Sequence, residues 1–464
     1  MSMTEIIHKE NAALRESYDL VKHKSGLSIY VIPKRMTTAY ALFGTHYGAI
    51  DNCFRLEGES DFFHVPDGIA HFLEHKMFES EDGGDTNERF AMLGASANAF
   101  TSADMTAYEF SCTENFYEAL AILLDYVTHP YFTEENVKKE QGIIGQEISG
   151  CHDNPHRRLY ESILSLLYEK SNIRIPICGT HESIAKITPE LLYRCYHTFY
   201  QLSNMALVVC GDIETEKVIS VADAVLNQRE NKKIDRYFEA DLDFPTKKRM
   251  SISMPIGTPL FAIGFKDCTR FKTPEEEMRR VLIMRLLTEL LFGTSTEFYG
   301  RMYEEGLLTP SFSGGYESTR EASFYLLFGE SPDPEAVYEK TLAMLNEKGK
   351  ASPPRRISFV YAAPCTQSIF VSLIPPRRSP MNFWRISLQE SIFWTLVPCF
   401  PRSRMRRQWP RLTDFLPTTL PLWPWSIPYR KTTPDHKKEN FILWQSELTE
   451  KRFLQASVRS SRGK

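Results

Sequence analysis

The first 230 residues alternate between short apolar strands and amphipathic helices. Apolar runs at residues 26–33 and 39–50 predict two strands, and the continuous apolar run at 204–212 predicts a buried strand. Residues 115–127 and 157–169 instead place leucines at helical spacing. Strands separated by helices in this pattern predict an α+β domain, in which helices pack on one face of a sheet.

A second unit begins after a stretch that is rich in charge. Residues 231–250 are interpreted as a linker, and strands are predicted at 251–254 and 261–265. A capping box at Thr273 then opens a long helix, which Gly293 closes. The sequence therefore predicts a first domain over residues 1–230, a linker over 231–250 and the N-terminal part of a second domain over 251–350.

Residues 351–464 continue neither pattern. They contain all 6 Trp, 14 of the 27 Pro and one of the 23 Gly, and they carry 19 Lys and Arg against 6 Asp and Glu. Proline pairs interrupt helices and strands alike, and no period of 3.6 or 2 is sustained. Three interpretations compete: a basic extension that binds nucleic acid or an acidic surface through residues 402–411, a diverged domain, or a shift of reading frame near Gly349. The abrupt change in composition favours the frame shift, which would leave the tail without function and the second domain without much of its sheet.

Composition excludes some classes of protein. A chain of 464 residues has room for two to four domains, and its net charge of −4 argues against a nucleic-acid-binding protein. The 9 Cys include no C-x-x-C motif, which favours reduced thiols over a disulfide framework. Neither a signal peptide nor an apolar run of the ~18 residues typical of a membrane span is found. We therefore expect a cytoplasmic protein that binds no nucleic acid and crosses no membrane.

One short motif carries the clearest chemistry. His71, Glu74 and His75 form H-x-x-E-H on a helix that is expected to open near Gly68, with Asp67 as its N-cap. Side chains four residues apart share a helix face, so both imidazoles can bind one Zn²⁺ while Glu74 takes a proton from the metal-bound water. The simpler interpretation is a core helix whose histidines are satisfied by hydrogen bonds. A third ligand would distinguish the two.

Two glutamates downstream supply a candidate for the third ligand. Glu140 and Glu147 are seven residues apart, so they project from one face of a predicted helix. The alternative is that both are solvated surface residues, which is the usual position of Glu on a helix. The combination with the first motif favours a role in the site.

A third stretch, between the other two, has the sequence Asn98-Ala99-Phe100-Thr101 and is predicted as a strand that follows a turn. Together the three motifs resemble the insulinase (pitrilysin) family of zinc peptidases, in which a Glu follows H-x-x-E-H by seventy-odd residues. Glu147 follows His75 by 72. In this family the Asn-Ala-Phe-Thr segment is an edge strand beside the zinc. The resemblance implies that all four residues bind the backbone of an extended peptide substrate by β-augmentation.

The resemblance also implies a fold and a set of roles. The expected fold is α+β, a two-domain insulinase-type clamshell in which each half is an antiparallel-rich sheet covered by helices, with the second half incomplete or aberrant after about residue 350. The expected activity is that of a zinc-dependent endopeptidase acting on short or unfolded peptides. His71, His75 and Glu147 would bind one Zn²⁺ per chain, Glu74 would be the catalytic base, and Glu140 would support the site from outside the ligand set.

The second half departs from the family pattern at one position. Family members carry an Arg and, seven residues on, a Tyr that help to hold the substrate; Arg301 matches the Arg, but Leu308 stands at the Tyr position. In the bacterial branch a paralogous subunit often supplies this pair. We therefore expect a homodimer or heterodimer with a paralogous family member, of the type associated with 5-aminopentanol modification of elongation factor P.

The rival hypothesis is a catalytically inactive structural or partner-binding subunit of the same family, or an enzyme made defective by a frameshifted C-terminus. Inactive members have usually lost a ligand or the base. His71, Glu74, His75 and Glu147 are all present here, which favours catalysis.

Overall fold

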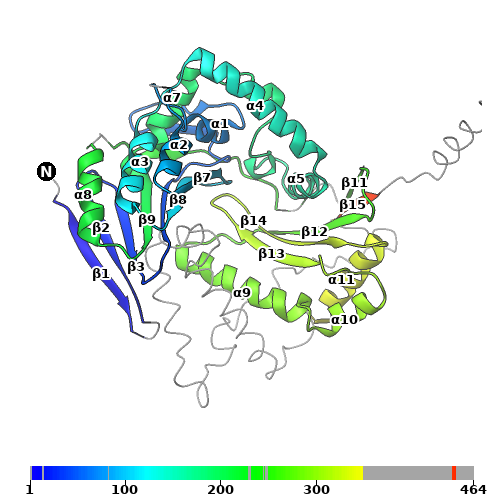
Figure 1. The fold of residues 1–464 in the computed structure, drawn as a ribbon. Coiled ribbons are helices and arrows are strands. Elements are labelled where there is room, and N and C mark those ends of the chain that lie inside the picture. The colour runs from blue at the N-terminus through cyan, green and yellow to red at the C-terminus, as the bar shows by residue number, and fades with distance from the viewer. Residues whose placement is uncertain are drawn as a thin grey trace, which may run out of the picture.

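The computed structural model describes residues 3–12, 15–81, 83–227, 231–243, 245, 249–348 and 441–445. These residues form two halves, one built on a seven-stranded sheet and the other on a five-stranded sheet (Figure 1). The predicted α+β fold of two antiparallel-rich sheets covered by helices is confirmed. No helix in the described part of the chain combines the length and apolar character needed to cross a membrane.

The first sheet has the strand order β1-β2-β3-β9-β4-β8-β7. Only β3 and β9 pair in parallel, and the other neighbours are antiparallel. Because β7 lies at one edge, one of its sides is unpaired among the described strands. The bounds are β1 (Glu5–Asn11), β2 (Glu16–Lys22), β3 (Ser28–Pro33), β4 (Ala39–Thr45), β7 (Ser96–Thr101), β8 (Thr106–Cys112) and β9 (Met205–Gly211).

Helices cover one face of this sheet and enclose the main hydrophobic core. Alternate strand residues such as Phe43, Tyr108 and Val209 pack against buried helical residues such as Phe72 and Leu123. The helices are α1 (Ile69–Lys76), α2 (Thr86–Met92), α3 (Phe116–Thr128), α4 (Glu134–Asp153), α5 (Pro155–Leu167), α6 (His181–Ile184), α7 (Pro189–Phe199) and α8 (Thr215–Val225), with 3₁₀ turns at Asn172–Arg174 and Leu202–Asn204.

Two segments differ from their sequence-based interpretation. The polar N-terminal stretch forms β1 and β2, whose side chains alternate too weakly in hydrophobicity to predict strands. The predicted linker contributes β10 (Ile234–Arg236), which pairs with β5 (Cys53–Leu56) in a small sheet completed by β6 (Phe63–His64). The start of the linker therefore belongs to the first half.

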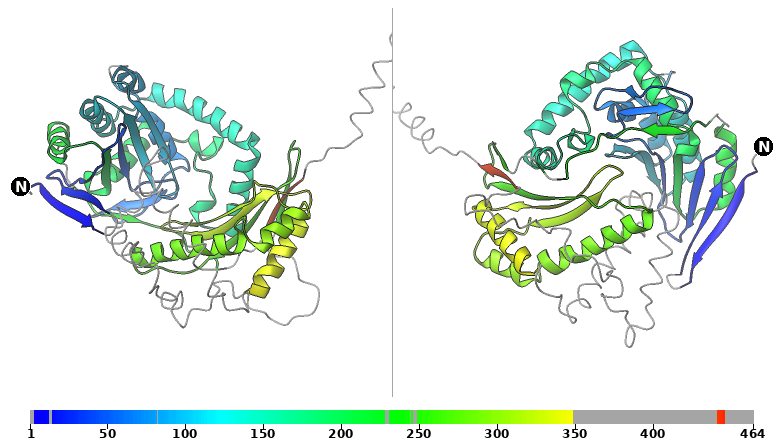
Figure 2. Two further views of the ribbon diagram at one scale, coloured as in Figure 1. Left: turned by 60° about the horizontal axis from the view of Figure 1, so that its bottom comes forward. Right: turned by 180° about the vertical axis from the view of Figure 1, so that it is seen from behind.

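The second sheet has the order β11-β15-β12-β14-β13. Helix α5 of the first half packs on one face, and the three helices of the second half pack on the other (Figure 2). As predicted, Thr273 caps the first of these helices and Gly293 ends it. The bounds are β11 (Arg249–Ser253), β12 (Leu260–Asp267), β13 (Ser313–Ser318), β14 (Ser323–Glu330), β15 (Phe441–Gln445), α9 (Pro274–Phe292), α10 (Glu297–Glu304) and α11 (Pro334–Lys348).

The prediction of an aberrant tail over residues 351–464 falls outside the described residues, apart from β15. This strand inserts between β11 and β12, parallel to the first and antiparallel to the second. Its sequence Phe-Ile-Leu-Trp-Gln contains no proline and has high β-propensity, so it differs from the proline-rich sequence around it.

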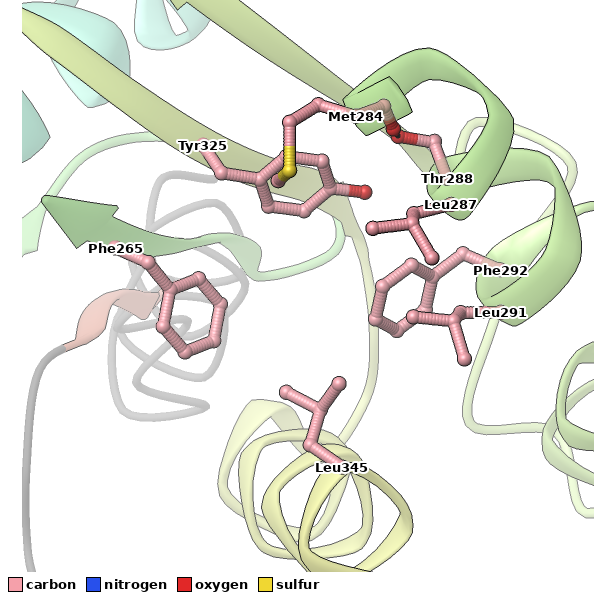
Figure 3. Close-up of a pocket in the computed structure, with 8 residues that line it drawn as sticks. All are labelled: Phe265, Met284, Leu287, Thr288, Leu291, Phe292, Tyr325 and Leu345. Carbon is pink, nitrogen blue, oxygen red and sulfur yellow. Dashed lines mark hydrogen bonds between the residues drawn. The ribbon is translucent and has the colours of Figure 1, made fainter. Parts of the chain in front are cut away.

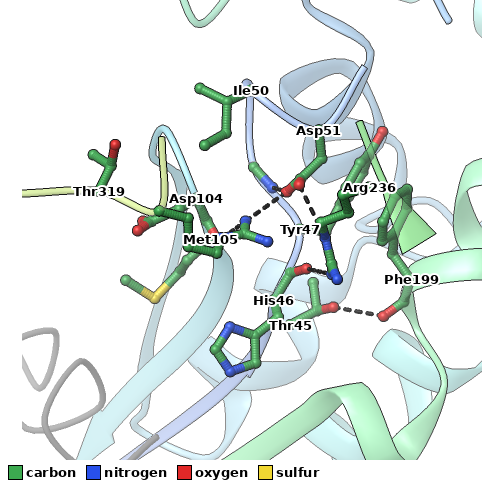
Figure 4. Close-up of polar contacts among 12 residues, drawn as sticks. Thr45, His46, Tyr47, Ile50, Asp51, Asp104, Met105, Phe199, Arg236 and Thr319 are labelled. Atoms are coloured by element: carbon green, nitrogen blue, oxygen red, sulfur yellow. Dashed lines mark hydrogen bonds and ion pairs between the residues drawn. The ribbon is translucent and has the colours of Figure 1, made fainter. Parts of the chain in front are cut away.

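A buried charged cluster joins the two halves (Figure 4). The fully buried carboxylate of Asp51, in the loop after β4, lies 3.0 Å from Nε of Arg236 on β10 and 2.7 Å from Nη2 of Arg320 in the β13–β14 turn. Arg320 also donates a hydrogen bond of 2.8 Å to the carbonyl oxygen of Asp104, just beyond β7. One residue of the second half therefore contacts the turn that follows the edge strand.

Candidate metal centre

Helix α1 carries the H-x-x-E-H motif and begins at a glycine. Gly68 has a φ of 87° and occupies the N-cap, whereas the sequence predicted Asp67 there; Asp67 instead accepts a hydrogen bond of 2.8 Å from Asn52. A Cβ atom on Gly68 would lie 2.6 Å from the carbonyl oxygen of Cys178. Both the backbone conformation and this close approach require glycine, and together they fix where α1 starts.

Helix α4 brings the two glutamates to α1. Its N-terminus is closed by a capping box between Thr133 and Asn136, and it runs for 20 residues. Two turns of α4 separate Glu140 from Glu147, so both carboxylates lie on one face of α4 and reach α1. The side chain of Glu140 is 8% exposed and that of Glu147 is 36% exposed, so the second is accessible to a ligand from solvent.

Three side chains converge as metal ligands would. Nε2 of His71 and Nε2 of His75 lie 3.6 Å and 3.7 Å from Oε2 of Glu147. Tetrahedral ligands about 2.1 Å from a zinc ion are roughly 3.4 Å apart. Among the described residues this is the one group of three or more His, Cys, Asp or Glu side chains close enough to hold an ion. Two imidazoles and a carboxylate fit zinc in both type and spacing.

The two histidines have different surroundings. Oε1 of Glu140 lies 3.0 Å from Nδ1 of His75. A proton on that nitrogen leaves Nε2 free for a metal. Burial, together with the charges of His75 and Arg157, lowers the pKa of His71 to about 3, which keeps its imidazole neutral and able to bind a metal. Burial opposes the charged form of His75 as well, but the hydrogen bond to Glu140 and the nearby carboxylates raise its pKa.

Glu74 lies beside the ligands and is held by a residue of the edge strand. Its carboxylate is buried, and its Oε2 accepts a hydrogen bond of 2.6 Å from the hydroxyl of Thr101. Burial raises the pKa of Glu74 even though this hydrogen bond acts in the opposite direction. Because Thr101 occupies Oε2, the other oxygen is left to exchange a proton. Sequence reasoning assigned Thr101 to the substrate and missed this contact.

The remaining residues of the predicted substrate strand lie on the two faces of β7. Ala99 packs toward the helices and Phe100 toward the opposite face of the sheet. Asn98 is exposed and lies opposite Glu109 of β8 in the sheet. The backbone of these residues therefore lies along an edge, beside Glu74, that no other described strand pairs with.

Arg301 is not brought to this cluster. It lies on α10 with its side chain 66% exposed, and α10 is on the face of the second sheet away from the first half (Figure 1). Leu308, at the position of the family tyrosine, is buried in the core of the second half. Arg301 as a substrate-binding residue stays a prediction.

A pocket in the second half has an apolar lining. Its walls come from β12, β14, α9 and α11, and none of the described residues that line it is Asp, Glu, His, Cys, Lys or Arg (Figure 3). The lining residues are Phe265, Met284, Leu287, Thr288, Leu291, Phe292, Tyr325 and Leu345.

Comparison of the sequence with known proteins identifies a family. The model described as Insulinase (Peptidase family M16) matches residues 65–181, and the model described as Peptidase M16 inactive domain matches residues 186–354. Over 356 residues the chain is 41% identical to a Bacillus subtilis (strain 168) protein named uncharacterized zinc protease YmfH. This match covers 75% of the chain and 82% of that protein.

Solved structures agree with the sequence matches. An M16-like peptidase from Alicyclobacillus acidocaldarius superposes with a TM-score of 0.73 at 32% identity, covering 80% of this chain and 85% of that one. The peptidase M16 inactive domain from Pseudomonas fluorescens shares the fold, with a TM-score of 0.66 at 15% identity and coverage of 92% and 97%. The extent of these matches shows that this chain belongs to the insulinase family, peptidase family M16.

Proposed function

We propose that this protein is a zinc-dependent endopeptidase that hydrolyses short or unfolded peptides. The observation that carries the proposal is the convergence of His71, His75 and Glu147, with the carboxylate of Glu74 next to them. Relatives named zinc proteases support the choice of metal. One zinc ion per chain is proposed, because a single group of this kind occurs in the described residues.

The protein's own residues have defined parts in the reaction. Zinc, when bound, polarises the scissile carbonyl group and lowers the pKa of a water molecule. Glu74 accepts the proton of the attacking water at Oε1 and returns it to the leaving amine, while Thr101 holds Oε2. The open edge of β7 offers backbone N–H and C=O groups to an extended peptide, with Asn98 and Ala99 in the segment that aligns it. Recognition through main-chain groups selects unfolded substrates rather than particular sequences.

We further propose that the protein works in the cytoplasm with a paralogous family member, as a homodimer or heterodimer of the type associated with elongation factor P modification. Leu308 at the tyrosine position and the exposed, remote Arg301 favour a partner that completes the substrate site. All seven cysteines in the described residues are free thiols, which supports a reducing compartment.

Removal and return of the metal test the function. We expect the purified full chain, alone or with its partner, to contain about one zinc per chain and to lose peptide hydrolysis on treatment with a chelator. Stoichiometric Zn²⁺ should restore hydrolysis, because the three ligands leave a position open for water. Metal analysis and cleavage of a quenched fluorescent peptide measure both effects. A protein that takes up no zinc would refute the proposal, whereas one that binds zinc but cleaves no peptide with any partner would favour the inactive subunit.

We also propose that a frame shift near Gly349 replaced the natural end of the chain. The match to the M16 inactive domain ends at residue 354, close to the change in composition. From Val281 onward helix α9 carries apolar residues on several sides, yet of its residues only Met284 and Phe292 are buried. A helix with apolar residues on several sides normally packs against neighbouring elements on those sides. The low burial of α9 therefore supports the loss of elements that would cover it.

Sequencing the coding DNA over codons 340–360 from an independent template tests the frame shift. We expect one or two bases to be gained or lost, and the corrected frame to continue the family pattern. An unchanged frame would make residues 351–464 genuine and would contradict this proposal.

A further inference from the structure

We propose that Lys76 is a positioning residue of the metal centre, acting through Glu140 on His75. This inference rests on the proposed zinc site. Lys76 immediately follows the second ligand on α1, and its side chain is 0% exposed. A buried ammonium group is strongly disfavoured unless it is paired and hydrogen-bonded. Lysine at this position therefore needs an explanation that a core helix alone does not give.

The ammonium group of Lys76 has three partners. Oε2 of Glu79 lies 2.6 Å away, the carbonyl oxygen of Asn136 accepts a hydrogen bond of 3.3 Å, and Oε2 of Glu140 lies 3.8 Å away. The first two distances lie within hydrogen-bond range, whereas Glu140 forms an ion pair at a longer distance. Because Asn136 and Glu140 both belong to α4, Lys76 ties the helix of the two histidines to the helix that supplies Glu147.

Glu140 divides its two oxygens between Lys76 and the ligand. Oε1 contacts Nδ1 of His75 and Oε2 faces the ammonium group. This almost completely buried carboxylate lies within 4 Å of the Lys76 ammonium group, which holds Oε2 while Oε1 faces the ligand. Held in this way, Oε1 accepts a hydrogen bond from Nδ1 of His75 and fixes the ring with Nε2 toward the metal. Outer partners of this kind change metal affinity 10–100-fold when they are lost.

A double-mutant cycle on the full chain tests the inference. Zinc dissociation constants are measured by chelator competition for wild type, Lys76→Met, Glu140→Gln and the double variant. We expect Lys76→Met to weaken zinc binding at least about tenfold, and the double variant to bind within about threefold of Glu140→Gln, because Lys76 acts through Glu140. The visible spectrum of the Co²⁺-substituted protein should change in Lys76→Met, since it reports the ligand geometry.

Glu79→Gln is the matched control, because it removes a partner of the same ammonium group and leaves Glu140 intact. We expect its zinc affinity to stay within about threefold of wild type. If Lys76→Met does not fold by circular dichroism, Lys76→Gln takes its place with the same expectation. The inference would be overturned if a folded Lys76 variant bound zinc with wild-type affinity. It would also be overturned if the loss of affinity in the double variant equalled the product of the losses in the two single variants. Wild-type protein that binds no zinc would instead refute the proposed function.

Discussion

Replacing Glu74 with Gln is expected to lower peptide hydrolysis by about 10²–10⁴-fold while zinc stays bound. Glutamine keeps the size of the side chain and can still accept the hydrogen bond from Thr101. It cannot accept the proton of the attacking water, so the loss should fall on kcat rather than KM. Zinc content should be unchanged, because the three ligand atoms come from His71, His75 and Glu147.

Single-turnover cleavage of a fluorescent peptide, with metal analysis on the same sample, measures this prediction. Glu88→Gln, on an exposed position of α2, is a suitable control and should retain wild-type activity. Hydrolysis by Glu74→Gln at the wild-type rate would mean that another group is the base. Loss of zinc together with activity would mean that Glu74 is needed to bind the metal.

Replacing Asp51 with Asn is expected to destabilise the protein by about 3–5 kcal/mol, because two guanidinium groups would be left without their buried counter-charge. Asn has the same shape but no charge, and the side chains of Arg236 and Arg320 are only 17% and 29% exposed. Asp51 and Arg236 belong to the first half and Arg320 to the second, so their interaction holds the two halves together. The contact between the halves should weaken before either core unfolds.

Urea unfolding followed by circular dichroism, with limited proteolysis between residues 231 and 250, measures the effect. Glu239→Gln removes the exposed ion pair with Lys170 and should leave the unfolding midpoint close to that of wild type, because solvent screens such a pair. An unfolding midpoint for Asp51→Asn equal to that of this control would show that the buried cluster contributes little.

The sequence predicted the elements with strong periodicity and clear end signals. Thr188 and Pro189 mark the start of α7, Thr273 and Gly293 bound α9, and the apolar run at 204–212 is the buried strand β9. Local signals were insufficient where the backbone conformation depended on a neighbour. The sequence placed the start of α1 near Gly68 but assigned its N-cap to Asp67. Gly68 is the N-cap, and the loop at Cys178 leaves no room there for a side chain, a distant contact that no local pattern contains.

By itself the sequence predicted the candidate metal centre, because helical spacing places His71 and His75 on one face. It did not determine how the surrounding side chains divide their contacts. Only the tertiary structure shows that Thr101 contacts Glu74. It also shows that Glu140 contacts both His75 and Lys76, and that Arg320 of the second half contacts Asp51 of the first. These partners are 27 to 269 residues apart in the chain. Such contacts follow from how sheets and helices pack rather than from any local periodicity.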